Sequence, residues 1–175
     1  MNLKHLVLGG TRSGKSRFAE NLINMQCQKT QAPKFYVATA TVLDSEMEQR
    51  ILQHQNDRDD NWLLIEESLD LAAIINQAKV EDCLLIECLT LWLNNCLYYN
   101  NWPEHKTNFI NALKASSSTI VMVSNEVGQS VVPANALSRQ FIDETGRLHQ
   151  ELATICNNVS LITAGISQTL KSHSE

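Results

Sequence analysis

Residues 9–16 of this 175-residue chain read Gly9-Gly10-Thr11-Arg12-Ser13-Gly14-Lys15-Ser16. The stretch matches the phosphate-binding loop pattern G-x-x-x-x-G-K-[ST], with Gly9, Gly14, Lys15 and Ser16 at the defining positions. Glycines let the backbone turn tightly enough to point successive N–H groups at phosphate oxygens, and the N-terminus of the following helix adds partial positive charge. The motif therefore predicts a nucleoside triphosphate site, with Lys15 on the β- and γ-phosphates and the Ser16 hydroxyl on Mg²⁺.

The residues on either side of the motif support this interpretation. The apolar run Leu6-Val7-Leu8 comes directly before it and is typical of a buried parallel strand. Residues 16–23 follow it, with Phe18, Leu22 and Ile23 at helical spacing. Strand, loop and helix thus occur in the order that a phosphate loop requires, which argues against an ordinary glycine-rich turn.

The rest of the chain alternates between predicted strands and predicted helices. Strands are predicted from apolar or β-branched runs at 34–40, 83–87, 119–124 and 158–164. Helices are predicted at about 45–58, 68–79, 89–97 and 104–115 and from Pro133 onward. This alternation predicts an α/β fold of the phosphate-loop NTPase type, with a mostly parallel sheet of about five core strands flanked by helices on both faces. The length favours a single domain over residues 1–175.

Composition excludes several classes of function. The formal net charge of −5 argues against a nucleic-acid-binding surface, which needs concentrated Lys and Arg. No apolar stretch approaches the roughly 18 residues of a membrane span, and the N-terminus lacks the apolar core of a signal peptide, so a cytoplasmic location is expected. The five cysteines include no C-x-x-C pair and indicate neither a disulfide framework nor a zinc site.

Polar residues follow several predicted strands. Because the C-terminal ends of parallel strands meet at one edge of a sheet, Gly9, Thr39, Glu87 and Asn125-Glu126 are expected to converge there. Glu87 closes an apolar strand, as does the acid that holds Mg²⁺ in many phosphate-loop enzymes, although a solvent-facing acid is the alternative. Glu126 is a second candidate, with a turn residue as the alternative.

A further candidate lies on the helix predicted at about 45–58. Arg50, His54 and Arg58 are four residues apart and therefore share one helix face, which would attract phosphate. Imidazole titrates near pH 6.5, so a neutral His54 can act as a nucleophile on the α-phosphate of a nucleotide. The spacing alone favours an exposed polar face instead. No role is assigned to the remaining histidines, His5, His105, His149 and His173.

Five stretches together resemble one enzyme family. They are the phosphate loop, Ala38-Thr39-Ala40, Arg50-Ile51-Leu52-Gln53-His54, residues 87–93, and Ser124-Asn125-Glu126-Val127-Gly128 followed by Val131-Val132-Pro133. The last stretch is specific to far fewer families than the phosphate loop, which is widespread. The chain resembles the bifunctional adenosylcobinamide kinase/adenosylcobinamide-phosphate guanylyltransferase family of cobalamin biosynthesis over nearly its whole length.

The resemblance implies two transferase reactions on one scaffold. ATP or GTP first phosphorylates the aminopropanol hydroxyl of adenosylcobinamide. GTP then guanylylates a histidine with loss of pyrophosphate, and the GMP group passes to adenosylcobinamide phosphate, giving adenosylcobinamide-GDP. The resemblance assigns the guanylylated histidine to His54, and the phosphate-loop motif makes Lys15 the catalytic lysine of the kinase step. Gln53 is a departure, because some members have adjacent histidines here.

The resemblance also implies a wider nucleotide site and a homotrimer. The phosphate-loop pattern itself predicts Mg²⁺ at Ser16 and Glu87. The implied nucleotide-binding positions are residues 9–16, Ala38, Thr39, Ala40, Gln55, Asn56, Asp57, Arg58, Glu66 and Glu87. A phosphate-loop kinase for another small molecule, with His54 as a surface residue, is the alternative function. A non-catalytic GTPase switch is disfavoured because the chain lacks an Asn-Lys-x-Asp motif.

Overall fold

The computed structural model describes residues 3–41, 61–129 and 131–172. Its strands are β1 (Lys4–Gly9), β2 (Lys34–Ala38), β3 (Trp62–Glu66), β4 (Cys83–Glu87), β5 (Thr119–Asn125), β6 (Asn158–Thr163) and β7 (Ile166–Lys171). Its helices are α1 (Lys15–Thr30), α3 (Leu71–Gln77), α4 (Leu89–Tyr98), α5 (Trp102–Ala115) and α6 (Ala136–Ile155). The described strands form one sheet in the order β3-β2-β4-β5-β1-β6-β7.

The sheet is parallel except at one edge. Every neighbouring pair from β3 to β6 is parallel, whereas β7 pairs antiparallel with β6. A two-residue turn, Ala164-Gly165, joins these two strands, and both residues have positive φ, 52° and 78°. Two-residue turns of this conformation match the twist of paired antiparallel strands. The mostly parallel sheet predicted from the sequence is confirmed, with a hairpin added at one edge.

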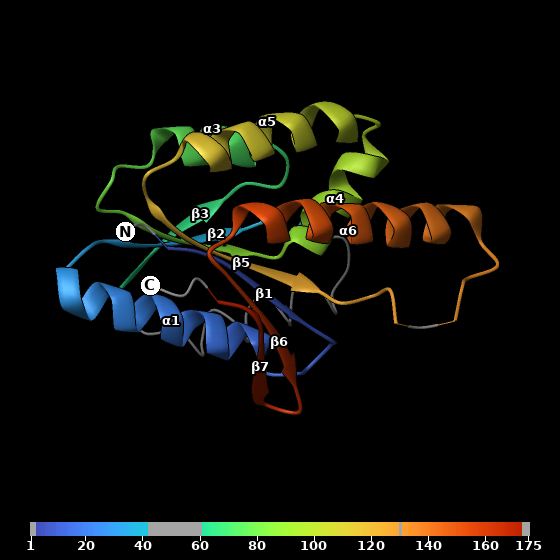
Figure 1. Ribbon diagram of the computed structural model, residues 1–175. Coiled ribbons are helices and arrows are strands. Elements are labelled where there is room, and N and C mark those ends of the chain that lie inside the picture. The colour runs from blue at the N-terminus through green and yellow to red at the C-terminus, as the bar shows by residue number, and fades with distance from the viewer. Residues whose placement is uncertain (1–2, 42–60, 130, 173–175) are drawn as a thin grey trace.

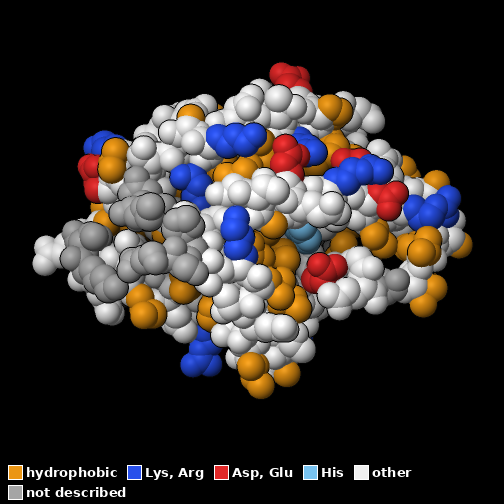
Figure 2. All heavy atoms as spheres, viewed as in Figure 1, with side chains coloured by type: hydrophobic (Ala, Val, Ile, Leu, Met, Phe, Trp, Pro, Cys, Tyr) orange, Lys and Arg blue, Asp and Glu red, His pale blue; other side chains and the backbone are white. Residues whose placement is uncertain are grey.

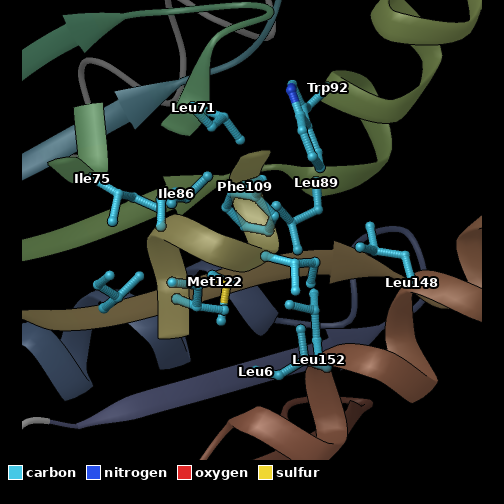
Figure 3. Packing of buried hydrophobic residues seen from close by; sticks show 14 of the residues in the cluster. Leu6, Leu71, Ile75, Ile86, Leu89, Trp92, Phe109, Met122, Leu148 and Leu152 are labelled. Atoms are coloured by element: carbon cyan, nitrogen blue, oxygen red, sulfur yellow. The ribbon is translucent and has the colours of Figure 1, made fainter. Parts of the chain in front are cut away.

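Helices cover both faces of the sheet, as predicted (Figure 1). Of the described helices, α1 packs on one face, where Ala19 and Ile23 meet Val7 and Val121 of the sheet. Helices α3, α4, α5 and α6 pack on the other face. Figure 3 shows Phe109 of α5 near Ile86 and Met122 of the sheet, and the ring of Trp92 of α4 packs on Phe109 with centroids 4.7 Å apart. Neighbouring positions along a strand point to opposite faces, which is why the buried strands are apolar without interruption.

The two edge strands depart from the sequence predictions. The sequence predicts no strand between 40 and 83, but Trp62–Glu66 forms β3, which pairs only with β2 among the described strands. Leu63 and Leu64 are 53% and 45% exposed there, as befits an edge strand. The second unpredicted strand is β7, so the described sheet has seven strands rather than about five.

Two helices begin at other residues than the sequence predicts. Helix α3 begins at Leu71 rather than near 68, because the Asp70 side chain accepts a hydrogen bond from the Ala73 N–H. Helix α5 begins at Trp102, two residues earlier than predicted, with Pro103 in its first turn. The helix predicted at about 45–58 lies outside the described residues. No helix within the described ranges is long and apolar enough to cross a membrane.

Candidate functional site

The loop between β1 and α1 has the conformation that a phosphate loop needs. Gly14 immediately precedes α1 with a φ of 94°, a value that glycine adopts readily. Within the described part of the chain, no side chain caps the N-terminus of α1. Its first N–H groups and its positive dipole end are therefore available to an anion.

Gly9 is required by close packing beneath the loop. A Cβ atom at this position would lie 2.5 Å from Ser13 Oγ and 2.6 Å from the backbone oxygen of Ile162. The β6–β7 hairpin supports the loop from the same side, because the Gly165 N–H donates to the Ser13 carbonyl at 2.8 Å. The unpredicted hairpin thus helps to hold the phosphate loop in shape.

Lys15 and Ser16, the first two residues of α1, have partners at the mouth of the loop. Lys15 Nζ donates to the Gly10 carbonyl at 3.2 Å, which places its positive charge over the loop. Ser16 Oγ donates to Glu87 Oε1 at the end of β4. The other carboxylate oxygen, Oε2, is buried and has no hydrogen-bond partner among the described residues.

The Ser16–Glu87 pair is suited to a hard cation. Mg²⁺ prefers oxygen ligands and is commonly held by one or two protein groups together with substrate phosphates. The described residues contain no cluster of three or more His, Cys, Asp or Glu side chains that could hold a metal by itself. A hydroxyl and a carboxylate with an unpaired buried oxygen fit the predicted Mg²⁺ site at Ser16 and Glu87.

Thr39 fixes the end of β4. Its Oγ1 accepts from the Cys88 N–H and donates to the Cys88 carbonyl, both at 2.8 Å. Its backbone N–H donates to the Glu87 carbonyl at 3.0 Å. Thr39 is fully buried, so these bonds hold Glu87 in place beside α1. The predicted nucleotide contacts at Ala38, Thr39 and Ala40 stay a prediction.

The predicted convergence of strand ends is confirmed. In the sheet register Ala38 lies opposite both Glu66 and Glu87, and Gly9 lies opposite Asn125. Glu66 is exposed at the outer edge, and its nucleotide contact stays a prediction. The predicted catalytic His54, its neighbours Gln55, Asn56, Asp57 and Arg58, and Arg50 lie outside the described residues.

The five cysteines are free and buried. Burial raises the pKa of Cys96 and of Cys156 to about 12. Thiols with such pKa values are not ionised near pH 7 and are poor nucleophiles. Covalent chemistry is therefore not expected at these positions.

The sequence assigns no role to His149, but in the structure its ring lies beside Ser124 and Glu126 at the end of β5. His149 Nε2 lies 2.7 Å from Ser124 Oγ, and its Nδ1 lies 3.8 Å from Glu126 Oε2. Burial lowers the pKa of His149, and the nearby Glu126 carboxylate opposes this effect. The three residues come from a strand, a loop and a distant helix, so no spacing in the sequence could have linked them.

A cavity of about 660 Å³ opens beside this group. Leu137, Phe141 and Ile142 of α6 form an apolar wall, whereas Asn94 of α4, Gln129 and Glu126 are polar. In Figure 2 a histidine is visible among hydrophobic side chains and next to an acidic one. A pocket with mixed walls of this kind can bind a small amphipathic ligand.

Known proteins resemble this chain along nearly its whole length. A protein of Pseudomonas aeruginosa called bifunctional adenosylcobalamin biosynthesis protein CobP is 40% identical over 174 residues, covering 97% of this chain and 98% of its own. Escherichia coli has a bifunctional adenosylcobalamin biosynthesis protein CobU that is 35% identical, with 95% and 98% covered.

Two solved structures share the fold at low sequence identity. A KaiC-like protein of Pyrococcus horikoshii has a TM-score of 0.52 and 17% identity, covering 90% of this chain and 69% of its own. The flagellar accessory protein FlaH of Methanocaldococcus jannaschii has a TM-score of 0.54 and 11% identity, covering 96% and 77%. The family model for cobinamide kinase / cobinamide phosphate guanyltransferase matches residues 5–170. The chain belongs to this family.

Proposed function

We propose that this protein phosphorylates adenosylcobinamide with ATP or GTP and then transfers GMP from GTP through His54 to the product, giving adenosylcobinamide-GDP and pyrophosphate. The observation that carries the proposal is the phosphate loop with Ser16 bonded to Glu87, in a chain of this family. The family description names both a kinase and a guanyltransferase.

The kinase step rests on positioning and on neutralisation of charge. In phosphate loops the helix N-terminus and the lysine contact the β- and γ-phosphates, and the N-terminus of α1 and Lys15 would do so here. Ser16 and Glu87 would hold Mg²⁺, which when bound neutralises phosphate charge. Lys15 stabilises the migrating phosphoryl group, whose charge is spread over its three equatorial oxygens.

The guanylyl step rests on nucleophilic catalysis by His54. A neutral ring nitrogen attacks the α-phosphorus of GTP, so that an N–P bond forms and pyrophosphate leaves. A phosphate oxygen of adenosylcobinamide phosphate then attacks the same phosphorus and releases the histidine. The resemblance to the family carries this assignment. On a helix, Arg50 and Arg58 would share one face with His54, and such a face would attract phosphate.

Labelling with GTP that carries ³²P at the α-position tests the guanylyl step. The wild-type protein should acquire acid-labile label, and the His54→Ala variant should acquire none. His105→Ala on α5 is the matched control and should label like the wild type. Equal labelling of the wild type and His54→Ala would refute the assignment.

The proposal also covers the oligomeric state and the cellular location. We infer a homotrimer of a single-domain chain, residues 1–175, that works in the cytoplasm, where nucleoside triphosphates are available. The net charge of −5 supports small-molecule substrates rather than nucleic acid as the partner. Sedimentation equilibrium should give about three times the chain mass of 19.7 kDa, and a monomer mass would contradict the trimer.

A further inference from the structure

Glu126 lies next to the phosphate loop. Strand β5 lies between β1, which leads into the loop, and β4, which ends at Glu87. Glu126 directly follows β5, and its backbone N–H donates to the carbonyl of Gly9 at 3.0 Å. This bond fixes the Glu126 backbone at the first residue of the phosphate loop.

One carboxylate oxygen of Glu126 accepts a hydrogen bond, and the other has none from the described residues. Oε1 accepts from the Gly128 N–H at 2.7 Å. Oε2 has His149 Nδ1 at 3.8 Å, beyond hydrogen-bond distance, and the side chain is 23% exposed. Since burial lowers the pKa of His149, its ring is mainly neutral near pH 7 and does not tie the carboxylate into a strong ion pair.

The neighbouring acids are engaged elsewhere. Glu87 accepts from Ser16 and is assigned with it to the Mg²⁺ site, and Glu144 accepts from Trp102 and Arg147. Glu126, by contrast, lines the cavity of about 660 Å³. The cavity has an apolar wall from α6 and side-chain amides at Asn94 and Gln129, so it suits an amphipathic molecule with a polar end.

We propose that Glu126 is the general base of the phosphorylation step, and that the cavity beside it binds the part of the acceptor that carries the alcohol. The inference rests on the kinase half of the proposed function. The acceptor is an alcohol on a large amphipathic molecule. Its hydroxyl proton passes to Glu126 Oε2 as the oxygen forms a bond to the γ-phosphorus. The bond from that phosphorus to the β-γ bridging oxygen breaks, and the nucleoside diphosphate leaves.

Comparing the two reactions of the family distinguishes a general base at Glu126 from a residue that only stabilises the structure. An alcohol must lose a proton on phosphorylation, whereas the phosphate group that accepts GMP is already ionised near pH 7. The Glu126→Gln variant keeps an oxygen that can accept from Gly128 N–H but loses the basic carboxylate. It should therefore impair one reaction and spare the other.

The experiment measures both reactions on Glu126→Gln. The kcat for phosphorylation of adenosylcobinamide should fall on the order of 100-fold or more, the usual contribution of a general base. GMP transfer to adenosylcobinamide phosphate, supplied ready-made, should stay within about twofold of the wild type because it needs no general base. Glu151→Gln, which removes an acid of α6 that pairs with Lys106, is the matched control and should leave both rates unchanged.

A second pair of variants tests the cavity. Leu137 lines it and is 74% exposed, so Leu137→Ser should fold and should raise KM for adenosylcobinamide several-fold, with KM for the nucleotide unchanged. Val80→Ser, at an exposed position between α3 and β4, should change neither constant. An unchanged acceptor KM in Leu137→Ser would overturn the cavity assignment.

The outcomes are distinct. Near-normal phosphorylation by Glu126→Gln, or an equal loss of both reactions, would overturn the role of Glu126 as a base. A wild-type protein that leaves adenosylcobinamide unphosphorylated would overturn the proposed function itself, and this inference with it.

Discussion

At the scale of single residues, the two adjacent glycines of the phosphate loop differ in what they tolerate. A methyl group on Gly9 would meet the backbone oxygen of Ile162 at 2.6 Å, whereas nothing lies within 4 Å of the corresponding position on Gly10. Gly9→Ala should therefore lower the free energy of unfolding by about 1–3 kcal/mol, the usual cost of overpacking. Gly10→Ala should change it by less than about 0.5 kcal/mol. Urea denaturation compares them, and equal losses would contradict the packing argument.

His5 links stability to pH. It is buried in β1 with Nε2 2.9 Å from Ser160 Oγ, and burial lowers its pKa to about 4. The unfolded chain binds this proton near pH 6.5, so the unfolded state gains protons first and stability falls as the pH drops from 6.5 towards 4. The shift corresponds to about 3 kcal/mol over that window.

Replacing His5 should remove its share of the stability loss between pH 6.5 and 4. His5→Asn carries no titrating group here, so its free energy of unfolding should fall less than that of the wild type between pH 6.5 and 4. Urea denaturation at several pH values measures the difference. Parallel pH curves for the two proteins would show that the buried imidazole is not the source.

At the scale of elements, the start of α6 depends on one cap. The Asn135 side chain accepts from the N–H groups of Leu137 and Ser138, and the helix beyond carries the apolar cavity wall and His149. Asn135→Ala should cost about 1 kcal/mol of stability. Gln140→Ala, at an exposed position on the same helix, is the control and should stay within about 0.5 kcal/mol. Indistinguishable urea midpoints would contradict the cap.

The sequence predicted the central strands but not the two edges, and the reason is physical. A buried parallel strand such as Cys83–Glu87 is apolar on both faces and is visible as an uninterrupted run. An edge strand depends on its partner, so strand propensity alone decides little. Strand β7 has mostly exposed residues and forms because the Ala164-Gly165 turn returns the chain alongside β6.

At the scale of the whole molecule, strand order explains which parts of the site could be predicted. The C-terminal ends of parallel strands must meet, so the approach of Gly9, Glu87 and Asn125 followed from the sequence. The Glu126–His149 approach and the cavity did not, because they arise when α6 packs beside α4 and against the sheet. Packing between distant segments has no periodic signature in the chain.

The central claim is that one chain performs both transfers. The direct measurement is the mass of the product formed from adenosylcobinamide, GTP and Mg²⁺. The wild type should yield adenosylcobinamide-GDP, and His54→Ala should stop at adenosylcobinamide phosphate. A wild-type reaction that ends at the phosphate, or a His54→Ala variant that still makes adenosylcobinamide-GDP, would contradict the account.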